Sequence, residues 1–228
     1  MSGNGIGGKG GVEMLEVLQK VELKTLALDG NGLSDAHSFP TALQESMGAP
    51  MWKELRRLRL GSQSLGNATA VALSRCIAEA PKLAELNLSW NCIDARGARP
   101  LLLSMKKTNV RVLDMSHNAL GEGGAFAMVE CVAVSENLTE LHADDCGIGL
   151  EPGLVLADAI RLSRRLRTLT LDDNPLGIAA ARRILAAISS VRRVDKYSMR
   201  NVKHDYIDRS DGAFAAYAPP AVAVRGKW

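Results

Sequence analysis

Apolar residues recur along this chain in a fixed frame that includes one amide side chain. The frame reads L-x-x-L-x-L-x-x-N-x-L, and its Asn position recurs at intervals of 32, 28, 27, 28 and 28 residues. A partial echo begins at Asn4, 27 residues before Asn31. Side chains alternate along extended backbone, so the paired leucines in the middle of the frame predict a short strand with one buried face. The Asn position is filled in turn by Asn31, Gln63, Asn91, Asn118, Cys146 and Asn174.

A helical pattern follows each strand frame. Apolar residues spaced three and four apart occur around Ala68–Cys76, Ala98–Met105, Ala125–Val132, Leu154–Ile160 and Ala181–Ile188, and the Val12–Leu18 run has the same character. Each unit is therefore predicted to be strand, turn, helix and turn. A single unit of this length cannot bury its apolar face alone, so successive units must stack on one another.

The Asn position has a chemical reason. A side-chain amide both donates and accepts hydrogen bonds, so it can satisfy backbone groups where the chain leaves a strand, and stacked units would form a ladder. Cys146 keeps only a small, weak donor in this position. Gln63 is longer than Asn, and we expect the ladder to be locally irregular there.

The frame, its period of about 28 residues and its full helix resemble the ribonuclease-inhibitor type of leucine-rich repeat over roughly residues 4–199. This resemblance implies an α/β fold: a right-handed solenoid, or horseshoe, of about seven repeats of 27–32 residues, with parallel strands on the concave face. We assign residues 1–199 to this repeat domain and residues 200–228 to an irregular, aromatic-containing C-terminal cap or docking tail. The family includes cytosolic immune receptors, Ran GTPase-activating proteins and ciliary scaffold subunits.

Composition narrows the class of ligand. A net charge of +3 gives no bulk electrostatic reason to expect nucleic acid. No apolar run approaches the length of a membrane span, and the first residues do not resemble a signal peptide. No two cysteines form a C-x-x-C pair, which indicates reduced thiols in a cytoplasmic protein; the four are Cys76, Cys92, Cys131 and Cys146. Gly3–Gly10 resembles a phosphate-binding loop but has Gly10 where a hydroxyl is required. We expect no metal, cofactor or small-molecule substrate.

Both ends of the chain depart from the frame. The sequence opens almost on an Asn position, so we expect either a piece of a longer repeat array, which we favour, or another chain covering this end. At the other end, Val202 stands where an Asn position should be. The tail is expected either to fold back on the last repeat or to dock on a partner, through Tyr206, Phe214, Tyr217 and Trp228.

The outward-facing strand positions supply the candidate binding residues. Aspartates gather late in the array, three arginines gather about three strands away, and Trp90, His117 and His142 add aromatic groups. An Asp before the Asn position could instead hold the turn, and nothing in the spacing closes a metal site around the histidines. The candidate partner-binding residues are Arg56, Arg57, Arg59, Trp90, Asp114, His117, His142, Asp144, Asp145, Asp172 and Asp173.

The predicted function is a non-enzymatic scaffold that binds protein partners through the concave face, the chain ends or both. It would suit a subunit of a larger assembly such as a ciliary axoneme. The frame brings together no nucleophile, base and orienting group. The alternative is a regulator, specifically an activator, of a small GTPase, although no residues here match the GTPase-contacting motif of the Ran activators.

Overall fold

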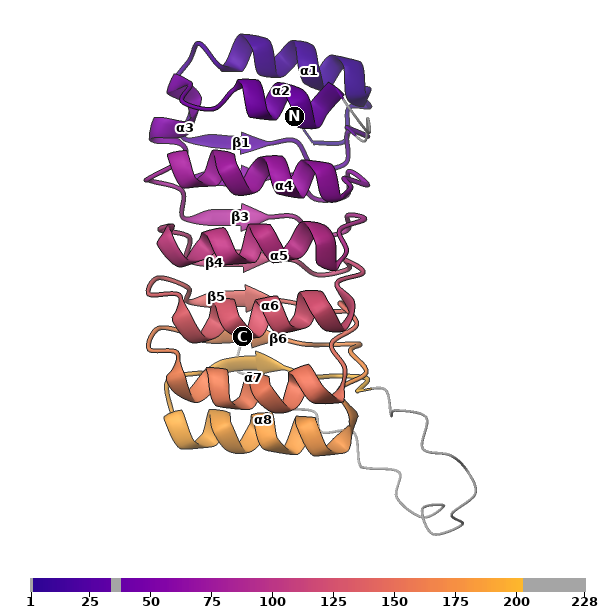
Figure 1. Ribbon diagram of the computed structural model, residues 1–228, viewed down its shortest axis with the longest axis vertical. Coiled ribbons are helices and arrows are strands. Elements are labelled where there is room, and N and C mark those ends of the chain that lie inside the picture. Colours follow the sequence, from indigo (N-terminus) through magenta and orange to yellow (C-terminus); the bar gives the residue numbers. More distant parts are fainter. Residues whose placement is uncertain (1, 34–37, 203–228) are drawn as a thin grey trace, which may run out of the picture.

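The computed structural model describes residues 2–33 and 38–202, which form a solenoid with its helices on one side and its strands on the other (Figure 1). Seven parallel strands pair in sequence order, which confirms the predicted α/β repeat architecture. The strands are β1 (Thr25–Ala27), β2 (Arg57–Arg59), β3 (Glu85–Asn87), β4 (Val112–Asp114), β5 (Glu140–His142), β6 (Thr168–Thr170) and β7 (Lys196–Ser198).

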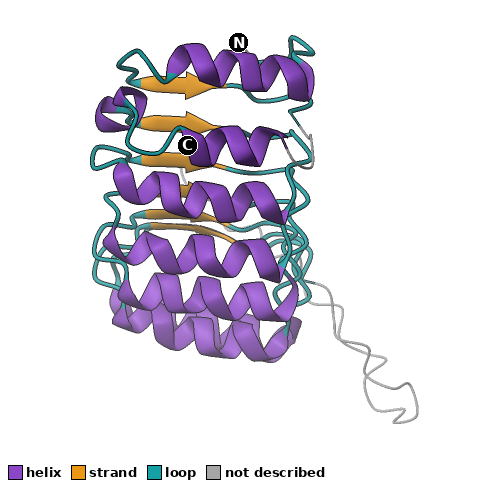
Figure 2. Cartoon of the chain, turned by 45° about the horizontal axis from the view of Figure 1, so that its top comes forward, coloured by secondary structure: helices purple, strands orange, loops and turns teal. Residues whose placement is uncertain are grey.

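The helices stack in a single layer on one face of the sheet, whereas the other face carries no helix from the described part of the chain (Figure 2). This open face is the one for which the sequence predicted a concave surface lined by strands. The helices are α1 (Gly7–Leu18), α2 (Ser38–Glu45), α3 (Pro50–Glu54), α4 (Asn67–Cys76), α5 (Ala95–Ser104), α6 (Gly121–Val134), α7 (Leu150–Leu162) and α8 (Gly177–Val191).

The core follows from the register of the strands. The middle residue of each strand lies beside the middle residue of the next, so the leucines from Leu26 to Leu169 form one buried row. Because each strand repeats the same alternation, the residues on either side of these leucines point to the open face. Tyr197 takes the leucine position in β7 and is only half-buried.

A hydrogen-bond ladder runs through the Asn positions. The Asn91 Oδ1 atom accepts from the amide of Leu65 at 2.9 Å, and its Nδ2 donates to the carbonyls of Leu60 and Leu88, each at 2.9 Å. Gln63 differs from the ladder asparagines in one bond: its side chain donates to no described carbonyl of its own repeat, whereas Asn91 donates to Leu88. The Gln63 Oε1 accepts from the amides of Asn31 and Leu33 at 3.0 Å, and its Nε2 reaches the carbonyl of Leu28. The longer side chain therefore keeps the bonds to the preceding repeat.

The first full unit, which is 32 residues long, differs from the single-helix prediction. It contains two helices, α2 and the short α3 that Pro50 opens. Trp52 of α3 is completely buried, and its Nε1 donates to Ser46 Oγ at 3.0 Å. The extra residues thus form a second helical turn with its own large core side chain, a feature that the periodicity did not indicate.

The N-terminal segment stacks on the first Asn turn as the echo at Asn4 predicted. The amide of Asn4 donates to Asn31 Oδ1 at 2.9 Å, and the amide of Gly3 donates to the carbonyl of Asp29 at 2.8 Å. The run Val12–Leu18 lies in α1, as expected for a repeat helix. The predicted tail residues Tyr206, Phe214, Tyr217 and Trp228 lie outside the described residues.

Candidate functional site

The residue directly before each Asn position adopts a left-handed backbone. This holds for Gly30, Ser62, Trp90, His117, Asp145 and Asp173, whose φ values lie between 49° and 68°. Glycine, asparagine and aspartate tolerate this conformation, but bulky side chains rarely adopt it. The turn at the end of each strand therefore forces one side chain per repeat outward, in a row along the rim of the open face.

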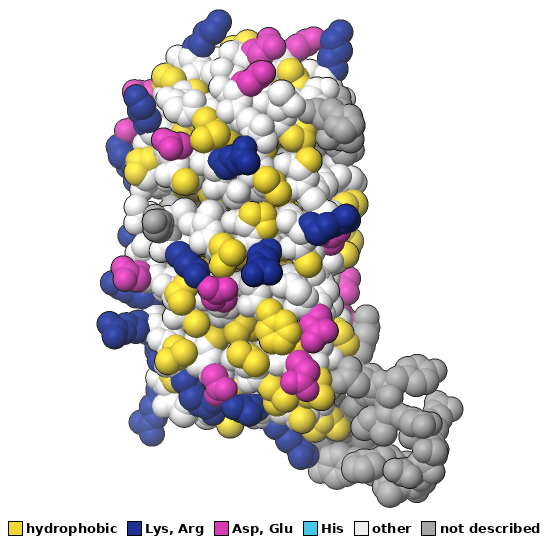
Figure 3. Space-filling model, viewed as in Figure 1, with side chains coloured by type: hydrophobic (Ala, Val, Ile, Leu, Met, Phe, Trp, Pro, Cys, Tyr) yellow, Lys and Arg dark blue, Asp and Glu magenta, His cyan; other side chains and the backbone are white. Residues whose placement is uncertain are grey.

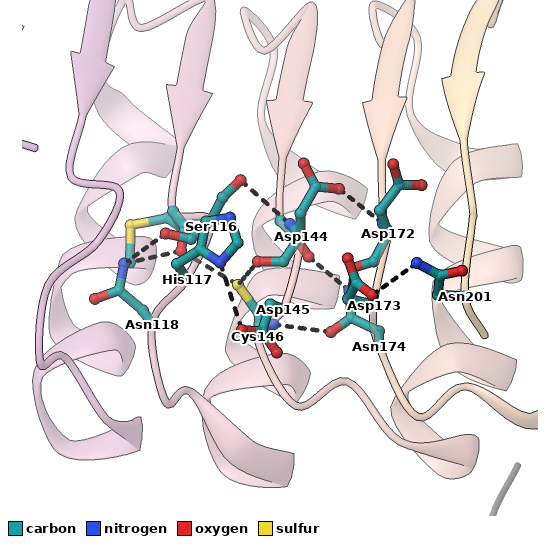
Figure 4. Close-up of polar contacts among 12 residues, drawn as sticks. Ser116, His117, Asn118, Asp144, Asp145, Cys146, Asp172, Asp173, Asn174 and Asn201 are labelled. Atoms are coloured by element: carbon teal, nitrogen blue, oxygen red, sulfur yellow. Dashed lines mark hydrogen bonds and ion pairs between the residues drawn. The ribbon is translucent and has the colours of Figure 1, made fainter. Parts of the chain in front are cut away.

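The middle of this rim row is aromatic. The rings of Trp90 and His117 stack, with centroids 3.8 Å apart and planes 20° from parallel. His117 Nδ1 lies 3.4 Å from Asp145 Oδ2, and Asn201 Nδ2 donates to Asp173 Oδ1 at 3.1 Å (Figure 4). Trp90 remains 59% exposed despite the stacking. The structure thus brings Trp90, His117 and Asp145 together in one contiguous strip.

Two of the candidate aspartates accept hydrogen bonds from the next repeat. Asp144 Oδ1 accepts from the amide of Asp172 at 2.7 Å, and its Oδ2 accepts from Thr170 Oγ1 at 2.8 Å. Asp172 Oδ1 accepts in the same way from the amide of Arg200, at 2.6 Å. Burial raises the pKa of Asp144, and the bonds from Thr170 and Asp172 oppose that rise. These contacts favour the turn-holding interpretation for Asp144 and Asp172.

Other candidates have roles within the sheet. Asp114 accepts from the amide of Ser116 at 3.0 Å and from Asn87 Nδ2 at 3.1 Å. His142 lies in β5, with its Nδ1 3.2 Å from Thr170 Oγ1. Within residues 2–33 and 38–202, no group of three or more His, Cys, Asp or Glu side chains could hold a metal ion. Since Asp114, Asp144 and Asp172 bind neighbouring backbone amides, the candidate carboxylates that point outward along the rim are Asp145 and Asp173.

The three candidate arginines do not form one patch. Arg59 Nε lies 3.2 Å from Asp29 Oδ2, near the carboxyl end of β2. Arg56 and Arg57 lie at the amino end of the same strand, where they line a hollow of about 480 Å³ together with Lys24 and Arg111. This basic hollow and the rim aspartates Asp145 and Asp173 therefore lie at opposite ends of the strands. From the sequence we expected the arginines and aspartates to be separated along the length of the array, and Lys24 and Arg111 were not among the predicted site residues.

The cysteines divide by burial. Cys76, Cys131 and Cys146 are buried, Cys92 is exposed, and all four are free thiols. Burial raises the pKa of Cys76 to about 11 and those of Cys131 and Cys146 to about 12. Cys146 occupies its Asn position by placing Sγ 3.2 Å from the carbonyl of Met115.

Comparison with known proteins supports the same repeat class. A family model described as Leucine Rich repeat matches residues 79–102 and 106–129. Tonsoku-like protein of Mus musculus is 31% identical over 155 residues, which are 64% of this chain and 11% of that protein. Ribonuclease inhibitor of Sus scrofa is 28% identical over 175 residues, 75% of this chain and 37% of that protein. The chain thus spans only a small part of the curated relatives it matches.

A solved structure shares the fold. The structure titled Leiomodin-1 Actin-Binding Site 2 superposes with a TM-score of 0.52 at 12% identity, over 69% of this chain and 92% of that one. The repeat frame, the parallel sheet and these likenesses define an α/β solenoid protein. The chain is a leucine-rich-repeat protein of the ribonuclease-inhibitor-like type. No helix in the described part of the chain is long and apolar enough to cross a membrane.

Proposed function

We propose that this chain is a non-enzymatic scaffold that binds a protein partner on its open sheet face, with Trp90 as the anchor. The observation that carries the proposal is an indole that is 59% exposed on the rim of this face and held flat against His117. Tryptophan is enriched at binding hot spots, where a large rigid side chain fills a pocket at little entropic cost. A side chain pre-ordered by stacking suits that role.

Backbone strain at Trp90 supports the same conclusion. Its φ of 56° is a left-handed conformation, which is unfavourable for a bulky residue and costs on the order of 1–3 kcal/mol. Gly30 and Asp173 fill the equivalent position in other repeats, and both suit this backbone better. Stacking on His117 offsets part of the cost, about 0.5–1.5 kcal/mol. An exposed, strained tryptophan is better explained by a binding role than by folding.

The charges on the rim suggest the chemistry of the partner beside this anchor. Asp145 and Asp173 point outward, whereas Asp144 and Asp172 are engaged in contacts between repeats. We infer that the partner carries a basic stretch over Asp145 and Asp173 and an acidic one toward Arg56 and Arg57. Such a split surface fixes orientation and the rate of association more than it adds affinity.

A partner captured by pull-down and identified by mass spectrometry provides the test. Trp90→Ala should weaken its binding by about 2 kcal/mol or more in calorimetry. Phe126→Ala is a matched control, because Phe126 is a 40% exposed aromatic on α6, on the helical side of the solenoid. If both variants bind like the wild type, the open face is not the binding site.

The functional alternative and the location can be tested with the same proteins. Leucine-rich-repeat proteins generally act as scaffolds without catalysis, and we extend this to the present chain. Stimulation of GTP hydrolysis by a small GTPase, lost in Trp90→Ala, would reject a scaffold-only function in favour of the GTPase regulator. We also infer a cytoplasmic location from the free thiols, with a ciliary assembly as one setting, and microscopy of a tagged chain tests both.

A further inference from the structure

A second feature of the open face is the basic hollow at the amino ends of β1 to β4. Its volume is about 480 Å³, and its charged lining consists of Lys24, Arg56, Arg57, Arg111 and the single carboxylate Glu85. On the helical side, Lys and Arg side chains also gather along the left edge in Figure 3, the edge from which the strand arrows start in Figure 1. The hollow therefore lies at a basic margin of a molecule whose net charge is only +3.

The backbone fixes the spacing of these cations. The amide of Arg56 donates to the carbonyl of Lys24 at 2.9 Å, that of Ala84 to Arg56 at 2.8 Å and that of Arg111 to Ala84 at 2.8 Å. The four residues thus form one row across adjacent strands, about 5 Å apart. Ala84 has almost no side chain, so Arg56 and Arg111 flank an open floor about 10 Å wide. Two long guanidinium side chains can converge over such a floor.

Most of these cations are not engaged in an ion pair with a described residue. Arg57 Nε lies 3.5 Å from Glu85 Oε2, which accounts for the one carboxylate in the lining. Lys24, Arg56 and Arg111 form no ion pair with any described residue. Glu54 nearby is already bound by Lys82; that bond lowers its pKa most, and the charges of Arg56 and Lys24 lower it further. The hollow therefore holds a positive charge that an anion would neutralise.

We propose that this hollow binds the phosphoryl group of a phosphorylated peptide segment in the protein partner. A phosphate dianion offsets more of the positive charge than one carboxylate does, and its oxygens match the paired donors of a guanidinium group. A nucleic-acid backbone suits the face less well, because Asp29 and the rim aspartates Asp145 and Asp173 would meet its further phosphates. The inference rests on the proposed function only in assigning the phosphate to a protein partner.

The hollow can be tested without the partner. The full chain is titrated with the peptide Gly-Gly-phosphoserine-Gly-Gly while its amide resonances are followed by NMR. We expect saturable shifts confined to residues 24–25, 56–57, 84–85 and 111–112, and none with the unphosphorylated peptide. Arg56→Gln and Arg111→Gln should each weaken the interaction about tenfold or more, because each removes charged donors.

Arg99→Gln is the matched control, since Arg99 is an exposed arginine on α5 and the charge change is the same. Equal weakening in Arg99→Gln, or no shifts at the hollow, would overturn the proposal. So would single-stranded DNA that binds the same residues more tightly than the phosphopeptide at equal phosphate concentration. Trp90→Ala should leave phosphopeptide binding unchanged, so failure here and failure of the Trp90 interface give different results.

Discussion

Removal of one ladder amide should destabilise the whole solenoid, and Asn174 offers the clearest case. Its side chain is completely buried, and its Oδ1 accepts from the amides of Cys146 and Ile148, both at 3.0 Å. Asn174→Ala leaves those two N–H groups buried without an acceptor. At about 1–3 kcal/mol for each, the expected loss of unfolding free energy is about 2–6 kcal/mol.

Urea unfolding followed by circular dichroism measures this loss, with the slope of the transition recorded to detect a breakdown of cooperativity. Asn201→Gly is the control, because Asn201 makes an exposed bond to Asp173 and glycine suits its φ of 52°, so the substitution should cost less than about 0.5 kcal/mol. Asn174→Asp keeps the acceptor but sets a carboxylate 2.7 Å from the carbonyl of Ala143, so its stability should recover at acid pH. A loss below about 1 kcal/mol in Asn174→Ala would refute the ladder reasoning.

Three further predictions concern thiols, a buried carboxylate and local opening. At pH 8, iodoacetamide should label Cys92 in the native protein. The three buried thiols, whose pKa values are about 11 to 12, should stay unmodified until denaturant is added, and mass spectrometry counts the labels. Because the pKa of Asp144 is raised in the folded state, the wild type should lose stability as pH rises through that pKa, and Asp144→Asn should lack this loss. Asp144→Ala should lower the free energy of unfolding by about 1–3 kcal/mol, measured by denaturant unfolding, because it removes the acceptor of two hydrogen bonds. Hydrogen exchange should be fast over residues 2–20 and slow through 83–176, where each repeat has neighbours on both sides, and uniform protection would contradict this.

The candidate site was only partly accessible from the sequence. The position of Trp90 just after a strand was sufficient to suggest that it points outward, and the structure gives it an exposed rim position. The division of the aspartates was not accessible, because Asp144 and Asp145 are adjacent in sequence yet one binds the next repeat and the other faces solvent. Only the register of β5 against β6 decides which carboxylate meets the amide of Asp172.

Sequence alone determined the repeat architecture of this protein. The alternation around Leu86 and the three-and-four spacing in Ala98–Met105 are local patterns that recur, and stacking of identical units is the one arrangement that buries all of them. Tertiary structure decided which side chains of neighbouring strands lie side by side. Arg56 and Arg111 are 55 residues apart in the chain but flank the same alanine, because each repeat returns the backbone to an adjacent strand. Such groupings depend on how far each side chain extends and on which residues the adjacent repeats place beside it, and the sequence of one repeat does not contain that information.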